Sequence, residues 1–237
     1  MADFSAITRR LRSFQAVMLK AVVFGLAWYF LPAWLFYITA AILYFIPFFQ
    51  WKKFFPFFIA TLGLYWFGPV TIWYAFVGAI LFGWLLGIRE MLLVGRKLAA
   101  ETLLLAILFF STRVLYAMNP VVMWSGLLES LGLAVVTGWM VRSLIDGFAD
   151  ERAGSPAVIR AASWLTALVM WQIMMVSFLL PLDFVYQATM VFLAAALLVD
   201  MASSYLWGEA ERKRILFVAS MVFVYFVIVL ASAPLGL

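Results

Sequence analysis

Four hydrogen-bonding side chains lie within long apolar stretches of the second half of the chain: Arg113, Glu129, Gln172 and Gln187. A charged or amide group in an apolar helix loses its contact with water, and this costs free energy unless a partner satisfies the group. Such residues in a membrane helix face the bundle interior or a water-filled cavity. These four residues could therefore bind a polar solute or an ion, or could join helices by hydrogen bonds.

Two interpretations of this polar layer remain open. In the first, Arg113 and Glu129 form a structural ion pair, because an arginine fork holds a carboxylate with two hydrogen bonds, and the glutamines join neighbouring helices. In the second, the four side chains line an outward-opening pocket for a small substrate or an ion. When depth is counted inward from the prolines of the outer turns, the four residues lie roughly 9 to 13 Å deep at 1.5 Å per residue.

Asp200 is a secondary candidate, close to Ser203 and Ser204 near the opposite end of its helix, where we expect an interface residue or a partner of Arg142. The chain has no cysteine and no histidine, which removes the usual zinc ligands and any Ser-His-Asp arrangement. It also has no paired carboxylate motif for magnesium and no glycine-rich phosphate loop. We therefore expect no catalytic residues, no metal and no cofactor.

The composition predicts that these residues lie on membrane helices. Of the 237 residues, 68% are hydrophobic and 11% are charged, whereas a soluble domain has about 45–50% and 25%. Apolar stretches recur from Ala21 to the end of the chain, and a bilayer core of about 30 Å requires about 20 apolar residues per helix. The predicted fold is an all-α integral membrane protein, a polytopic bundle of about nine transmembrane helices in a single membrane domain, 1–237.

The basic residues predict the orientation of this bundle. Of the 16 Lys and Arg residues, all except Arg113 fall in short clusters, and the apolar stretch between two clusters is long enough for two helices. If each stretch is a hairpin, the positive-inside rule puts the N-terminus in the cytoplasm and the C-terminus outside. Pro32, Pro69, Pro120 and Pro181 then mark outer turns. The predicted helices are 13–31, 34–50, 54–68, 71–88, 97–117, 121–143, 158–180, 183–206 and 215–232.

The two halves of the predicted bundle differ in composition. Residues 21–88 hold 24 of the 44 aromatic residues and only two charges, Lys52 and Lys53, whereas 97–232 carry the polar layer. We expect the four helices of 21–88 to form a mostly lipid-facing or partner-facing layer that tolerates apolar substitution. Aromatic residues near the outer turns are typical of an anchoring belt, and a lipid-binding or partner-binding surface is the alternative.

Two pairs of small residues at helical spacing predict close packing between helices. They are Gly83-x-x-x-Gly87 and Ala134-x-x-x-Gly138. Small residues at this spacing let two helix backbones approach closely. We expect them to be used for packing within the protein, with dimerisation as the alternative.

Three functional hypotheses follow. The first is a non-catalytic scaffold or integral subunit of a membrane complex, with the lipid bilayer and other proteins as its partners. The second is a small-solute or ion transporter that uses the polar layer in helices five to eight, and the third is a lipid-handling membrane enzyme. Membrane orientation explains the net charge of +5, so nucleic acid is not an expected partner. The expected location is the cell membrane, as a multi-pass protein of a prokaryotic cytoplasmic membrane.

Overall fold

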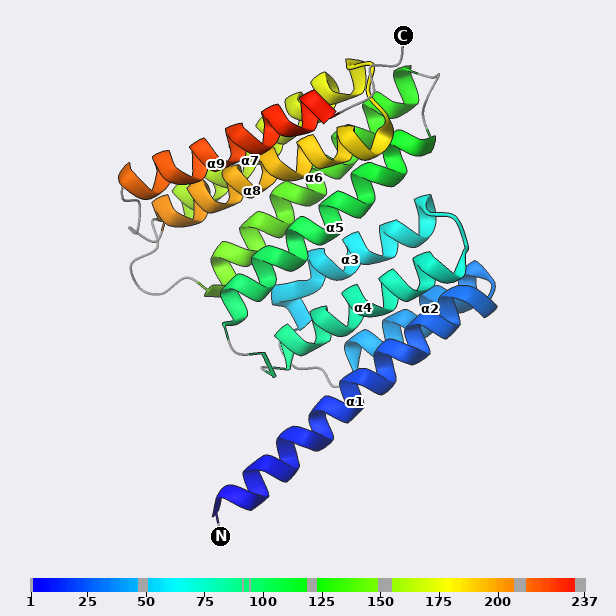
Figure 1. Cartoon of the computed structure of the whole chain (residues 1–237). Helices are drawn as coiled ribbons and strands as arrows, with labels where there is room; N and C mark the ends of the chain where they lie inside the picture. Colours follow the sequence, from blue (N-terminus) through cyan, green and yellow to red (C-terminus); the bar gives the residue numbers. More distant parts are fainter. Residues whose placement is uncertain are drawn as a thin grey trace. The chain divides into compact units, whose positions relative to one another are not determined.

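The chain is all-helical over the described residues. The computed structural model describes residues 2–46, 51–90, 92–93, 95–118, 123–148, 155–206 and 212–232; within these ranges, the side chains at 2–11, 51, 123, 203, 206, 212–215 and 218 are outside the description. The helices are α1 (Ala2–Phe30), α2 (Ala33–Phe45), α3 (Trp51–Phe67), α4 (Ile72–Arg89), α5 (Arg96–Met118), α6 (Met123–Phe148), α7 (Pro156–Leu179), α8 (Phe184–Leu206) and α9 (Arg212–Ser232) (Figure 1). The predicted all-α class is confirmed.

Six stretches among the described residues are long and apolar enough to cross a membrane. They are Arg12–Phe30, Ile72–Arg89, Arg96–Met118, Trp124–Phe148, Pro156–Leu179 and Phe184–Ala202. Two shorter apolar stretches are Ala33–Phe45 and Ala219–Ser232. Helix length and composition thus support the membrane class that the sequence predicted, while nine spans and their orientation stay a prediction.

Prolines mark several helix ends. Pro32 lies between α1 and α2, Pro69 lies between α3 and α4, and Pro181 lies between α7 and α8. Proline has no backbone N–H and clashes with the preceding turn, so it favours these breaks. Pro156 is the first residue of α7, where the missing N–H costs nothing. Pro120, which we assigned to another outer turn, is outside the described residues.

The chain divides into two compact units, and the division falls within α5. Unit 1 is Met1–Leu103 and unit 2 is Leu104–Leu237. We predicted a single membrane domain with two unlike halves, 21–88 and 97–232.

Unit 1 has an aromatic core. Its helix α1 packs against α4 and α2, and α3 packs against α4 and α2. The rings of Phe24 and Phe82 stack with their centroids 4.1 Å apart, and those of Phe36 and Tyr65 stack at the same separation. Other buried aromatic residues in this unit are Trp28, Tyr44, Phe54, Phe57 and Phe58. The expectation that 21–88 forms a mostly lipid-facing layer is wrong for these residues, because the rings pack against one another.

Other aromatic residues of unit 1 lie on its surface near the turns predicted to be outer. The exposed fractions are 64% for Trp34, 70% for Trp66 and 75% for Trp73. Indole rings favour the headgroup region because they combine an apolar body with a polar N–H. Trp28 and Tyr65 also lie near these turns in the sequence, where an anchoring belt was expected, but they are 1% and 9% exposed and belong to the core instead.

Small residues let helices approach within each unit. A Cβ atom added at Gly83 in α4 would lie 2.9 Å from the Cβ of Ala21 in α1. One added at Gly138 in α6 would lie 2.7 Å from the Cβ of Ala167 in α7. Both distances are too short for two carbon atoms in contact, so these glycines are required for packing inside the protein, as predicted. The surroundings of Gly87 are less crowded, and a Cβ there would make ordinary contacts.

Unit 2 has a core of aliphatic and methionine side chains. Its helices pack in chain order, with α6 against α7, α7 against α8 and α8 against α9. Residues 104–118 of α5 pack against α7 and α8 through this core. The buried members of the core are Leu108 and Tyr116 from α5, Met170 and Met174 from α7, and Ala188, Val191 and Ala195 from α8.

Candidate functional site

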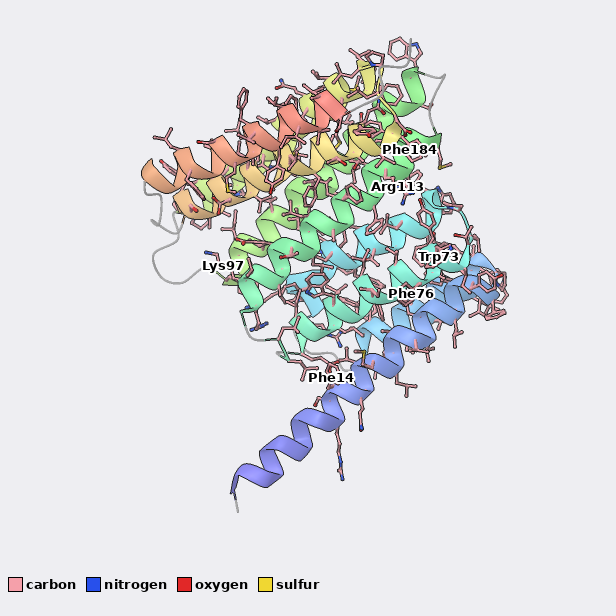
Figure 2. All side chains as sticks on the ribbon, in the orientation of Figure 1. Phe14, Trp73, Phe76, Lys97, Arg113 and Phe184 are labelled. Carbon is pink, nitrogen blue, oxygen red and sulfur yellow. The ribbon has the colours of Figure 1, made fainter. Side chains whose placement is uncertain are left out.

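The polar layer predicted from the sequence lies in unit 2, and its arginine contacts an aromatic ring. Arg113 is half-buried on α5, and the central carbon of its guanidinium lies 5.9 Å from the ring centroid of Phe184 at the start of α8 (Figure 2). A cation over a ring face is attracted by the ring quadrupole. Glu129 is half-buried on α6. A pair between Arg113 and Glu129 is not among the ion pairs that the structure gives for its described residues.

The two glutamines of the layer have different surroundings. Gln187 is buried on α8, and its side-chain nitrogen donates to the carbonyl oxygen of Leu180 at 3.0 Å. That bond closes the turn between α7 and α8. Gln172 is exposed on α7. Gln187 thus holds a local turn, while Gln172 lies on the surface of unit 2 and does not face its interior.

Tyr116 is a buried polar residue that the sequence reasoning missed. Its hydroxyl donates to the carbonyl oxygen of Met174 in α7 at 3.0 Å, and its ring contacts Phe178. The bond joins α5 to α7 inside the core. A signal was available, since Tyr116 follows Arg113 by three residues and so shares its helix face.

The buried hydroxyl groups of the membrane-length helices also bond to backbone carbonyls. Thr112 donates to Leu108, and Ser163 donates to Ile159, in each case one helical turn back. This local bond satisfies a hydroxyl within its own helix. The same pattern occurs at Thr137 and Thr166, and also at Thr61 in the shorter helix α3, and Ser130 bonds three residues back.

The secondary candidate Asp200 is half-buried near the end of α8. Its neighbour Ser204 is buried, and the side chain of Ser203 is outside the described residues. Arg142, which we considered as a partner of Asp200, lies 3.5 Å from Asp146, four residues further along α6. Both members of that pair are about half exposed, so its attraction is screened by solvent.

A second polar site lies in unit 1, where the sequence reasoning expected no chemistry. Arg89, at the end of α4, is fully buried, and its guanidinium donates to the carbonyl oxygen of Tyr44 and lies over the Tyr44 ring. Lys20 of α1 donates to the carbonyl oxygen of Ile46 at 2.5 Å. The Glu90 carboxylate lies 3.2 Å from Arg89 and 3.5 Å from Lys20. We call these five residues the α2-cap cluster.

The short length of α2 explains the α2-cap cluster. Its 13 residues span about 20 Å, less than the bilayer core of about 30 Å. The last carbonyls of a helix have no partner within the helix and carry partial negative charge. Arg89 and Lys20 supply donors and positive charge at that end, and Glu90 balances part of this charge.

The surface of unit 1 carries an apolar groove between α1 and α4, with a volume of about 830 Å³. Its floor lies where small residues bring the two backbones together, for example at Gly25, where an added Cβ would lie 2.9 Å from that of Ala79. Large exposed side chains form its walls, among them Met18, Val22, Leu26, Phe76 and Ile80. We call this feature the α1–α4 groove.

Comparisons of the chain with protein-family models, with curated proteins and with solved structures gave no significant match.

Proposed function

We propose that this protein is a non-catalytic scaffold or integral subunit of a membrane complex, with nine spans, its N-terminus in the cytoplasm and its C-terminus outside. Its expected location is a prokaryotic cytoplasmic membrane. The proposal is supported by how the chain uses its polar side chains, because the described hydrogen bonds of the buried ones end mainly on backbone carbonyls. These bonds stabilise helices and turns.

This observation extends over both units. In unit 1, Arg89 and Lys20 bond to the end of α2. In unit 2, Tyr116 bonds α5 to α7, and Gln187 bonds to the turn before α8. A buried donor without an acceptor costs about 1–3 kcal/mol, so these bonds stabilise the assembly of helices. A membrane protein built in this way presents a rigid apolar surface to lipid and to partner proteins.

Two further features support the nine-span topology. The turns at Pro32, Pro69 and Pro181 separate antiparallel helix pairs in the hairpin arrangement, and the basic clusters lie at the opposite helix ends. The α2-cap cluster gives a reason why a helix as short as α2 could span, because long cationic side chains reach from its neighbours to its last carbonyls.

Single-cysteine labelling tests the topology, because the natural chain contains no cysteine. Lys53→Cys and Val70→Cys lie at opposite ends of α3 and both replace exposed residues. On intact cells, a membrane-impermeant maleimide should label Val70→Cys and should label Lys53→Cys only after lysis. Labelling of Lys53→Cys on intact cells would contradict the proposed orientation.

The role itself is tested by isolating the protein from its native membrane without detergent, in polymer-bounded lipid particles. The proposal expects other membrane proteins at a fixed ratio to the chain. Recovery of the chain alone, together with solute uptake by vesicles that contain only this protein, would contradict it.

One observation favours a transporter as the second candidate. Arg113 lies in the outer part of a membrane-length helix, and its described contact is an aromatic ring. An arginine at such a depth is a candidate for binding an anionic solute. In that case, Arg113→Gln should fold normally and abolish uptake by vesicles, whereas a scaffold should show no uptake in either form.

A further inference from the structure

We infer that the α1–α4 groove binds an acyl chain of an anionic phospholipid, with the headgroup at the end of the groove nearest the N-terminus of α1. This inference rests on the proposed membrane location of the chain. Three observations support it, namely the size of the groove, its charge distribution and the shape of its floor.

The volume of the groove fits acyl chains. From Phe14 to Phe30 the axis of α1 rises about 24 Å at 1.5 Å per residue. A methylene group is close in size to a water molecule, about 30 Å³, so the 830 Å³ could hold roughly 28 methylene groups. The chains of one leaflet reach about 15 Å, half of the bilayer core, so this part of the groove would hold roughly 17 of these methylene groups, close to one acyl chain of a phospholipid. A helix about 10 Å wide and equally long would fill roughly 1,900 Å³ as a cylinder, so only one side of a partner helix could enter.

Basic residues flank one end of the groove. Arg12 is exposed two residues before Phe14, the first groove residue, and Arg9 and Arg10 precede it in the sequence. Arg96 follows Leu92 and Leu93, which line the same end. The opposite end is lined by Tyr29, Phe30 and Ile72 and carries no charged residue in the described part of unit 1.

Figure 2 shows the direction of the groove, with Phe14 near the N-terminal part of α1 and with Phe76 towards the other end, near Trp73. Basic residues at a membrane surface attract anionic lipids. An apolar groove with one cationic end is therefore complementary to a phospholipid whose headgroup is negatively charged. A zwitterionic lipid lacks the net charge that would favour this end.

The floor of the groove is shaped by small residues. Ala21 meets Gly83, and Gly25 meets Ala79, across the contact between α1 and α4. The backbones are close there, so the large exposed side chains on either side stand above a floor of small residues. An acyl chain can follow such a floor along the helix axes and gain contacts on both sides.

The test compares lipids retained by variants of the full chain. The acyl chains of one leaflet span about 15 Å, half of the bilayer core, and Val22 lies about 12 Å along α1 from Phe14. Val22→Trp therefore fills the groove within reach of the chains. Ile38→Trp is the matched control, since Ile38 is 52% exposed, Val22 is 56% exposed, and Ile38 lies on α2 outside the groove.

Each protein is reconstituted in vesicles of phosphatidylcholine with a minor fraction of phosphatidylglycerol, extracted in mild detergent and weighed by native mass spectrometry. The wild-type chain and Ile38→Trp should retain one phosphatidylglycerol, and Val22→Trp should lose it. Arg12→Gln should reduce the preference for phosphatidylglycerol about five-fold, which corresponds to about 1 kcal/mol. Arg160→Gln, an exposed basic residue of unit 2, should leave the preference unchanged.

Several outcomes would overturn the inference. They are equal retention by Val22→Trp and Ile38→Trp, equal retention of both lipids, or a second copy of the chain in place of lipid. Carbonate extraction of the same membranes tests the membrane location separately. A chain that stays in the membrane after extraction is integral, so loss of lipid binding then counts against the groove alone. A chain that is washed off contradicts the proposed membrane location itself.

Discussion

Unit 1 and unit 2 are both helical, but different side chains hold their helices together. Unit 1 is built on stacked aromatic rings such as those of Phe24 and Phe82, and three of its charged side chains meet in the α2-cap cluster. Unit 2 is built on aliphatic and methionine side chains, and Tyr116 adds a hydrogen bond between helices. The comparison shows that helices with similar apolar content can be joined by stacked aromatic rings in one region and by aliphatic and methionine side chains in another.

The largest expected effect comes from the α2-cap cluster. Arg89→Ala leaves the Tyr44 carbonyl without its donor and removes one partner of Glu90, so it should lower the free energy of unfolding by about 3–5 kcal/mol. Arg142→Ala is the control in unit 2, because Arg142 pairs with Asp146 on the surface and should cost less than about 1 kcal/mol. Thermal or denaturant unfolding in detergent measures both. Equal effects would remove the distinction between the two sites.

The aromatic core of unit 1 gives the next effect. Phe36 is fully buried against the ring of Tyr65, so Phe36→Ala should destabilise the protein by at least about 3 kcal/mol through lost contacts and a cavity. Trp34→Ala, two residues earlier on the same helix and exposed, should change the unfolding free energy little. If both substitutions are tolerated, unit 1 is a lipid-facing layer, as the sequence first indicated.

A smaller effect is expected where α6 meets α7. Gly138→Val adds a branched side chain where a Cβ would already lie 2.7 Å from that of Ala167, and overpacking of this kind costs about 1–3 kcal/mol. Gly132→Val carries the same change in helix propensity at a site with no atom within 4 Å of the added Cβ. The difference between the two melting temperatures isolates the packing contribution. No difference would mean that α6 and α7 are farther apart than the structure indicates.

The smallest effect concerns the bond between α5 and α7. Tyr116→Phe removes the hydroxyl that donates to Met174 and should cost about 1 kcal/mol. Tyr225→Phe, on the exposed surface of α9, is the control and should cost nothing measurable. A larger loss for Tyr225→Phe would show that α9 is covered in the assembled protein.

Sequence reasoning predicted the elements of this fold better than their contacts. Apolar stretches and prolines identify helices because both act through local backbone geometry, and Pro32 and Pro181 lie in turns as predicted. The inward orientation of Phe36 was not predictable from composition, since an aromatic residue in a membrane helix can face either lipid or protein. Spacing alone did identify Gly83 and Gly138, because a close approach of two backbones requires small residues.

The candidate site was predicted less well, for a related reason. The depth of a side chain in the membrane follows from the helical rise, but the direction in which the side chain points does not. Gln172 and Gln187 therefore have similar predicted depths, while only Gln187 is buried. Arg89 and Lys20 appeared to be ordinary residues of a charged cytoplasmic end. The signal that could have identified them is the short length of α2, whose last carbonyls require donors.

The central claim is that the polar residues within the membrane-length helices of unit 2 belong to its architecture, and water accessibility tests this claim most directly. Thr112 and Ser130 are buried, and Asp183 is exposed in the turn before α8. In the cysteine-free background, an impermeant maleimide should label Asp183→Cys rapidly, and Thr112→Cys and Ser130→Cys only after unfolding. Labelling of Ser130→Cys in the folded protein at a rate close to that of Asp183→Cys would reveal a hydrated cavity in unit 2 and would contradict the scaffold in favour of a transporter.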